Sequence, residues 1–203
     1  MLTRVDELIR PDHVRLAPDD ECYFVGEYFP REGYAFGATN DLIFNFKKPM
    51  DRRHTNQWAW KTWAIEQGAK QLRSLINPAW LNGAVLVPIP PSAAKGDPAH
   101  DDRNLQLAQQ MCQETGAAAR ELLYQDRTRT ALHASDERRT PEVLLQYFRI
   151  NEHAASPPPM RIGLIDDVLC TGATFRAGKI LLQQRFGAIP VLGFFLARRM
   201  LAG

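Results

Sequence analysis

Cysteine is scarce in this sequence of 203 residues, which contains three, at Cys22, Cys112 and Cys170. Because they are far apart and odd in number, they exclude a disulfide framework and a paired zinc knuckle, and they indicate a reducing compartment. Long apolar runs are also missing: no stretch approaches the ~20 residues of a membrane-spanning helix. The first ten residues hold no apolar segment of the secretory type. We therefore expect a cytoplasmic protein with no membrane partner.

A strong charge of either sign is lacking too. The chain has 25 Lys and Arg against 23 Asp and Glu, a formal net charge of +2, so no broad basic field is available for indiscriminate nucleic-acid binding. A Gly-x-Ser-x-Gly elbow is absent, which removes the usual framework of a nucleophilic hydrolase. The content of 45% hydrophobic and 24% charged residues is that of an ordinary globular protein with room for a core.

Two short, continuous apolar runs stand out against this background, at residues 84–89 (AVLVPI) and 162–168. Runs of this kind, bounded by glycine, proline or acids, are typical of strands buried on both faces of a parallel sheet. The second run is followed by a predicted helix over 174–185 and a predicted strand over 189–196. This strand, helix, strand order indicates an α/β fold with right-handed crossovers.

The N-terminal part of the chain has a different pattern. Residues 21–46 are rich in aromatic and β-branched side chains with turn signals between them, which predicts short strands. A long helical pattern follows and ends near Asn77 and Pro78. We therefore divide the chain into a β-rich segment over 1–57 and an α/β core over 58–203.

The strongest chemical signal follows the second apolar run, where Asp166 and Asp167 leave the end of the predicted strand. The helix beginning after them offers free N–H groups and a positive dipole to a phosphate, and Gly172 allows the backbone to approach it closely. Thr171 and Thr174 add hydroxyl donors. Paired acids beside such a loop need hydroxyls or a metal to satisfy them, and a ribose diol with Mg²⁺ supplies both. The simpler alternative is that the acids end a strand and cap a helix.

The run LIDDVLCTGAT resembles the signature of type I phosphoribosyltransferases that binds 5-phosphoribosyl-1-pyrophosphate (PRPP). The departure is Cys170, where a hydroxyl residue is usual, and a thiol is the weaker donor. The resemblance implies Mg²⁺ as cofactor, with Asp166 and Asp167 as metal ligands and as catalytic residues. It also implies a PRPP cradle formed by Asp166, Asp167, Val168, Leu169, Cys170, Thr171, Gly172, Ala173 and Thr174.

Within this superfamily the chain is most similar to the ComF-like branch. VPIP at 87–90, followed by Arg103, Asn104 and Gln106, resembles that branch's strand, diphosphate loop and helix. Further likenesses are LIFNFKK at 42–48 and the trio Arg129, Thr130 and His133, while the branch's N-terminal four-cysteine zinc module is absent. The resemblance implies a mainly parallel central sheet flanked by helices, with a small N-terminal β-rich hood, and a diphosphate loop that includes Pro91, Ser92 and Lys95.

In this family diphosphate leaves the sugar while a nitrogen nucleophile attacks, and cationic side chains close over the departing charge. The resemblance makes Arg103, Arg127 and Arg129 the candidates for that closure, with Lys95 as a further one. The segment 125–140, which also holds Arg138 and Arg139, falls where the family has its mobile flap. The alternative for any one of these arginines is a solvated loop position.

Three functions follow as expectations. The first is a Mg²⁺-dependent transferase that moves phosphoribosyl from PRPP to a nitrogenous base or amine, and the second is a regulatory protein that senses PRPP or a nucleotide without turnover. The third is a factor that binds single-stranded nucleic acid through Lys47, Lys48, Arg52 and Arg53. A homodimer is one arrangement implied by the family, and the acceptor stays unnamed because the first 50 residues carry no sharp motif.

Overall fold

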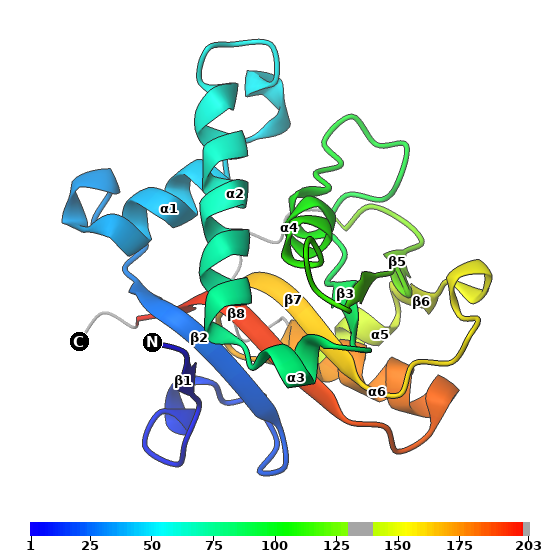
Figure 1. The fold of residues 1–203 in the computed structure, drawn as a ribbon. Coiled ribbons are helices and arrows are strands. Elements are labelled where there is room, and N and C mark those ends of the chain that lie inside the picture. Colours follow the sequence, from blue (N-terminus) through cyan, green and yellow to red (C-terminus); the bar gives the residue numbers. More distant parts are fainter. Residues whose placement is uncertain (130–139, 201–203) are drawn as a thin grey trace.

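The computed structural model describes residues 1–129 and 140–200, and its centre is a six-stranded sheet (Figure 1). The strand order is β1-β2-β8-β7-β3-β4, in which β1 is antiparallel to β2 and every other neighbouring pair is parallel. The predicted α/β class with a mainly parallel sheet is therefore confirmed. The strands of this sheet are β1 (Thr3–Arg4), β2 (Glu21–Tyr28), β3 (Val85–Pro88), β4 (Ala118–Ala119), β7 (Ile162–Leu169) and β8 (Val191–Arg199).

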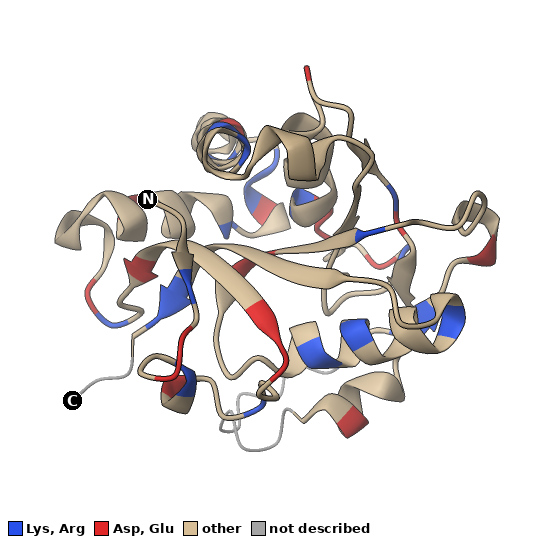
Figure 2. Ribbon diagram, turned by 60° about the horizontal axis from the view of Figure 1, so that its bottom comes forward, with Lys and Arg blue, Asp and Glu red and all other residues tan. Residues whose placement is uncertain are grey.

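Helices cover both faces of the sheet (Figures 1 and 2). One face carries α1, α2 and α4, with α1 and α4 each packed against α2, and the other carries α5 and α6. A short helix, α3, leads from α2 into β3. The bounds are α1 (Ala38–Phe46), α2 (Trp58–Leu75), α3 (Pro78–Leu81), α4 (Arg103–Met111), α5 (Pro141–Leu145) and α6 (Ala173–Phe186).

Burial on both faces explains the composition of the central strands. In β7, Ile165 belongs to the core shared with α1, α2 and α4, whereas Leu164 belongs to the core shared with α6. The same division holds in β3 for Leu86 and Val87. Successive side chains of a strand point to opposite faces, so each residue must be apolar wherever both faces are covered. The predicted strands at 84–89 and 162–168 are confirmed for this reason.

The prediction of short strands over residues 21–46 is wrong for the residues that form a helix, and the strand that does form lies in a different sheet from the one expected. Residues Ala38–Phe46 form helix α1, whose Leu42, Ile43 and Phe46 lie on one buried face at helical spacing. Strand β2 pairs along its length with β8, so it belongs to the central sheet and not to a separate β-rich hood. The division of the chain at residue 57 stays a prediction.

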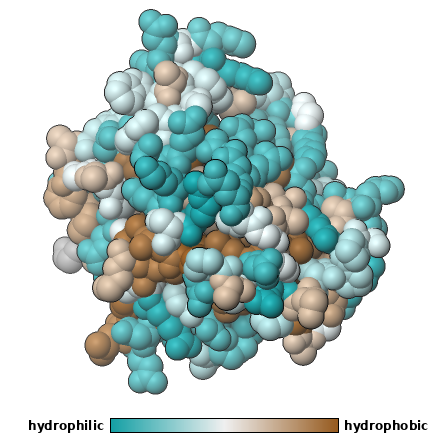
Figure 3. All heavy atoms as spheres, viewed as in Figure 1, coloured by the Kyte–Doolittle hydropathy of each residue, from teal (hydrophilic) through white to brown (hydrophobic). Residues whose placement is uncertain are grey.

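A second, two-stranded sheet stands apart from the first and joins β5 (Leu123–Gln125) to β6 (Phe148–Ile150) in antiparallel fashion. Hydrophilic residues dominate the upper part of the surface in Figure 3, and hydrophobic residues appear in a band over β2 and β8. Among the helices of the described residues, none combines the length and apolar character that crossing a lipid bilayer requires.

Candidate functional site

Asp166 and Asp167 lie within β7, near its carboxyl end and next to β3, because the strand continues past the acids to Leu169. The helices that follow these strands cover opposite faces, α4 after β3 and α6 after β7. The chain therefore leaves the two strand ends in opposite directions, and open α/β sheets bind ligands in the crevice that results. A pocket of about 270 Å³ occupies this position, lined by the end of β7, the segment after β3 and the start of α4.

The loop that joins β7 to α6 has the backbone of an anion cradle. Gly172 has φ of 89°, in the left-handed region, and a Cβ there would stand 2.5 Å from a methyl group of Leu16, so no other residue fits without strain. Helix α6 begins at once, and its N-cap residue, Gly172, has no side chain to cap it; the hydroxyl of Thr171 accepts from the backbone N–H of Ala173 at a long 3.4 Å. The first turn of a helix leaves N–H groups without helical partners at its positive end. This loop can therefore receive a phosphate, with Thr171 and Thr174 on its rim.

An N-terminal segment supports this loop from behind. The backbone N–H of Arg15 donates to the carbonyl of Thr171 at 2.9 Å, and Nδ1 of the fully buried His13 bonds to the carbonyl of Cys170. Burial is the main cause that holds the pKa of His13 below its usual value. The segment is anchored to α6 by the buried Asp20, which accepts from Lys179 at 2.7 Å. No sequence motif marked this support.

Asp167 is held between two cations. Arg103 donates through Nη2 to Oδ2 at 2.9 Å, and Nζ of Lys47 lies 3.4 Å from Oδ1. The backbone N–H of Val168 also donates to Oδ1, at 2.7 Å. Burial alone raises the pKa of Asp167, but Lys47 and Arg103 outweigh it, so that the pKa lies below its usual value. Asp167 is therefore a charged carboxylate at neutral pH.

Asp166 is adjacent in sequence but forms no ion pair with a cation of the described residues. Its Oδ1 accepts from Nδ2 of Asn104 and from the backbone N–H of Asp167, both at 2.9 Å, while Oδ2 lies 3.5 Å from the hydroxyl of Thr174. Burial, with a smaller contribution from the charge of Asp167, raises the pKa of Asp166 to about 6. Of the two acids, Asp166 is therefore the one whose Oδ2 has only a long hydrogen-bond contact among the described residues.

The cations on Asp167 belong to a longer chain of ion pairs. Asp101, in the loop before α4, accepts from the backbone N–H of Arg103 at 3.2 Å and from its Nη1 at 2.8 Å. The same carboxylate accepts from Nζ of Lys61 at 2.7 Å. Two buried atoms beside this chain have no hydrogen-bond partner among the described residues, Nε of Arg103 and Oδ1 of Asn104. Such atoms are rare in folded proteins and mark a site worth explaining.

The structure brings most of the predicted site residues to this pocket. The members that line it are Pro91, Ser92, Arg103, Arg129, Asp166, Asp167, Val168, Cys170, Thr171, Gly172, Ala173 and Thr174. Leu169 does not line it, because its side chain packs in the core against α6. Thr130, His133, Arg138 and Arg139 lie outside the described residues.

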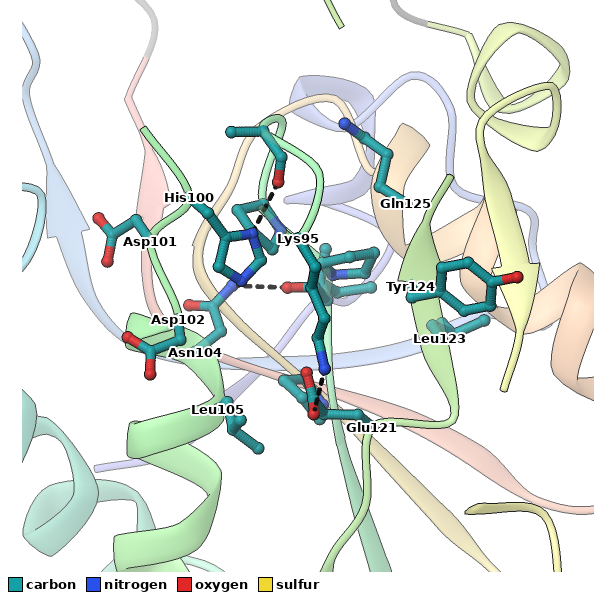
Figure 4. A pocket seen from close by; sticks show the side chains of 15 residues that line it. Lys95, His100, Asp101, Asp102, Asn104, Leu105, Glu121, Leu123, Tyr124 and Gln125 are labelled. Carbon is teal, nitrogen blue, oxygen red and sulfur yellow. Dashed lines mark hydrogen bonds and ion pairs between the residues drawn. The ribbon is translucent and has the colours of Figure 1, made fainter. Parts of the chain in front are cut away.

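Two of the predicted cations lie elsewhere. Lys95 lines a separate small pocket, in which its Nζ is paired with Glu121 at 2.8 Å (Figure 4). The side chain of Arg127 is mostly exposed and stacks over the ring of Tyr147, with 4.6 Å from its guanidinium carbon to the ring centroid. Arg129 does line the pocket, and its Nε donates to Oε1 of Gln125 at 2.6 Å.

Sequence reasoning missed Asp101, Asn104 and Lys47 as site residues. Asn104 and Lys47 fell within stretches that resemble the ComF-like branch, but neither was given a role there. The set of four cations predicted to bind nucleic acid does not form one exposed patch. Lys48 is buried and bonds to the side chain of Asn45, and Lys47 is turned to Asp167.

Metal binding by protein groups alone is not supported. Within residues 1–129 and 140–200, no three His, Cys, Asp or Glu side chains gather to hold an ion. Both oxygens of Asp167 already face cations, which leaves Oδ2 of Asp166 as the oxygen best placed for one. Mg²⁺ keeps several waters and binds through one or two carboxylates together with substrate phosphates. The residues therefore fit an ion that arrives with a phosphorylated ligand.

The sequence matches no protein-family model, and no curated protein matches it.

Proposed function

We propose that the protein binds PRPP and transfers its phosphoribosyl group to a nitrogenous base or amine, as a type I phosphoribosyltransferase. The observation that carries this proposal is the order of groups at the carboxyl end of β7: an acid pair of which Asp167 is buried, then a left-handed glycine, then a helix N-terminus whose cap residue has no side chain. These groups face a pocket of about 270 Å³ at the carboxyl edge of a parallel sheet. One ligand that uses both parts is a ribose phosphate, with its phosphate in the loop and its hydroxyls on the acids.

The two acids then have different tasks. Asp166 would accept from a ribose hydroxyl and hold Mg²⁺, because its Oδ2 makes a long contact, to Thr174, among the described residues. Asp167 stays charged and fixes Lys47 and Arg103 at the rim of the pocket. When bound, Mg²⁺ supplies positive charge to the diphosphate as that group departs. The segment Ile89–Ser92, at the end of β3, forms the wall on which the diphosphate lies.

A protein that senses PRPP without turnover is the second candidate, and the placement of the cations favours it. Transfer needs positive side chains over the leaving group. Of the predicted cations within the described residues, Lys95 and Arg127 lie away from the pocket, whereas Arg103 and Arg129 line it.

One assay separates the two functions. Diphosphate release is measured from PRPP and Mg²⁺ with a panel of purine, pyrimidine and other nitrogen acceptors, and turnover with any acceptor establishes the transferase. If no acceptor works but PRPP with Mg²⁺ raises the melting temperature, the sensor is favoured. Thr174→Val, which removes a hydroxyl from the cradle and keeps the side-chain size, should weaken that shift. Absence of binding to the parent protein would refute both functions.

A further inference from the structure

Lys61 is a buried lysine whose surroundings the proposed function leaves unexplained. It lies in the first turns of α2, its exposed fraction is 1%, and its ammonium has three acceptors. Nζ donates to the carbonyl of Lys48 at 2.7 Å, to that of Phe46 at 3.1 Å and to Oδ2 of Asp101 at 2.7 Å. An ammonium group has three hydrogens, so this one is saturated.

The three acceptors come from two segments that are otherwise separate in sequence. Phe46 ends α1 and Lys48 follows it, so Lys61 binds the carbonyls at the end of that helix, where a cation is favoured. The residue between them is Lys47, which faces Asp167. Asp101 precedes α4 and holds Arg103 by its backbone and side chain.

Lys61 therefore lies behind both cations that contact Asp167. On one side it fixes the backbone that carries Lys47, and on the other it fixes the carboxylate that orients Arg103. The two cations approach different oxygens of Asp167. For both cations to contact Asp167, the segment that holds Lys47 and the segment that holds Arg103 must be positioned at the same time. Packing of α1 against α2 alone does not fix the ammonium group of a lysine.

We propose that Lys61 is a positioning residue that ties the end of α1 to Asp101 and thereby holds Lys47 and Arg103 on Asp167 at the PRPP pocket. The expected effect on PRPP binding rests on the proposed function, whereas the expected effect on the position of Lys47 does not. Lys61 is not among the residues that line the pocket. Its effect on a ligand is therefore indirect.

The test compares Lys61→Met with two control variants, after circular dichroism has shown that all are folded. Lys179→Met removes another buried, ion-paired lysine, which contacts Asp19 and Asp20 and not this chain of ion pairs. Lys70→Met removes an exposed lysine from the same helix as Lys61. Acetylation of Lys47 by an acylating reagent is followed with peptide mass spectrometry, because an amine held on a carboxylate reacts slowly.

We expect Lys47 to be acetylated about fivefold or more faster in Lys61→Met than in the parent, and neither control to change its rate by more than about twofold. PRPP affinity, measured by calorimetry with Mg²⁺, should fall at least about tenfold in Lys61→Met. The affinity of Lys70→Met should stay at the parental value. If Lys61→Met does not fold, Asp101→Asn takes its place, since it weakens the contacts of both Lys61 and Arg103.

An unchanged acetylation rate of Lys47 in a folded Lys61→Met overturns the inference, whatever PRPP does. Faster acetylation with unchanged PRPP affinity also overturns it, because the positioning would then have no consequence at the pocket. Faster acetylation in a protein whose parent form binds no PRPP supports the placement of Lys47 and refutes the proposed function instead. The two failures are thus distinguishable.

Discussion

The adjacent acids Asp166 and Asp167 should respond in opposite ways when each is replaced by asparagine. At neutral pH, Asp166 carries a charge that burial and its neighbour disfavour, whereas the charge of Asp167 is compensated by Lys47 and Arg103. Asparagine at position 166 keeps an oxygen that can accept from Asn104. We therefore expect Asp166→Asn to stabilise the fold and Asp167→Asn to destabilise it.

The size of the first effect follows from the raised pKa. A shift of Asp166 from 3.8 to about 6 corresponds to at most about 3 kcal/mol at neutral pH, since each unit is worth about 1.4 kcal/mol. The buried amide keeps part of the desolvation cost, so we expect a gain of about 1–2 kcal/mol, or a melting temperature higher by about 2–6 °C. Asp167→Asn should lower the free energy of unfolding by about 1–3 kcal/mol. The loss is limited because Arg103 retains its ion pair with Asp101 and Lys47 is partly exposed to solvent.

Denaturant titration at pH 7.5 and at lower pH measures both variants against the parent. The folded state binds the proton of Asp166 more tightly than the unfolded state, so this group's contribution to stability is complete below its usual pKa of 3.8 and is lost as the pH rises through about 6. The advantage of Asp166→Asn should therefore shrink as the pH falls from 6 towards 4. A variant less stable than the parent at pH 7.5, or a gain that does not shrink on acidification, would refute the reasoning.

Three further measurements test the site. Gly172→Ala should lower the free energy of unfolding by about 2–4 kcal/mol, because it combines φ of 89° with a Cβ clash. Gly83→Ala, at φ of 80° with open space around it, should cost only about 1 kcal/mol, and equal losses in the two variants would show that the clash is relieved. PRPP affinity should fall about tenfold for each pH unit below about 6, as Asp166 takes up its proton, and calorimetry between pH 5 and 8 would contradict this with a flat profile. Arg103→Ala should weaken PRPP binding at least about tenfold, whereas Arg127→Ala, outside the pocket, should change it by less than about twofold; similar losses in both would mean that the ligand lies elsewhere.

The sequence was sufficient to predict those parts of the fold and site whose residues are close together in the chain. Strand β7 is covered on both faces and begins as an apolar run that leads into the two acids, and the loop with Gly172 follows shortly after, so strand and cradle were predicted together. Residues Ala38–Phe46 were assigned to strands because aromatic and β-branched residues favour them. Instead, these residues form a helix, because burial of Leu42, Ile43 and Phe46 against α2 outweighs the local strand propensity.

The ion pairs behind the acids could not be predicted in the same way. Lys61 and Asp101 are 40 positions apart, and Arg103 and Asp167 are 64 apart. Whether two such charges meet depends on how α2 and α4 cross over the sheet, which no spacing in the sequence encodes. The same limit applies to Lys95 and Arg127, which were predicted at the pocket from their charge and which the structure places outside its lining.

The charges gathered at the pocket explain why a diphosphate would bind here together with Mg²⁺. The ion-pair chain together with the adjacent Asp166 contains three cations and three acids. These are Lys47, Lys61, Arg103, Asp101, Asp166 and Asp167. With Asp166 ionised these charges cancel, so the chain has no excess positive charge for an incoming anion. The helix N-terminus provides about half a charge for one phosphate, and Arg129 is the further cation that lines the pocket within the described residues. A ligand with both a phosphate and a diphosphate carries more negative charge than these groups supply, and under the proposed function a divalent cation on Asp166 would make up the difference. Binding of PRPP should consequently depend steeply on Mg²⁺, while binding of ribose 5-phosphate, which needs only the loop, should depend on it little.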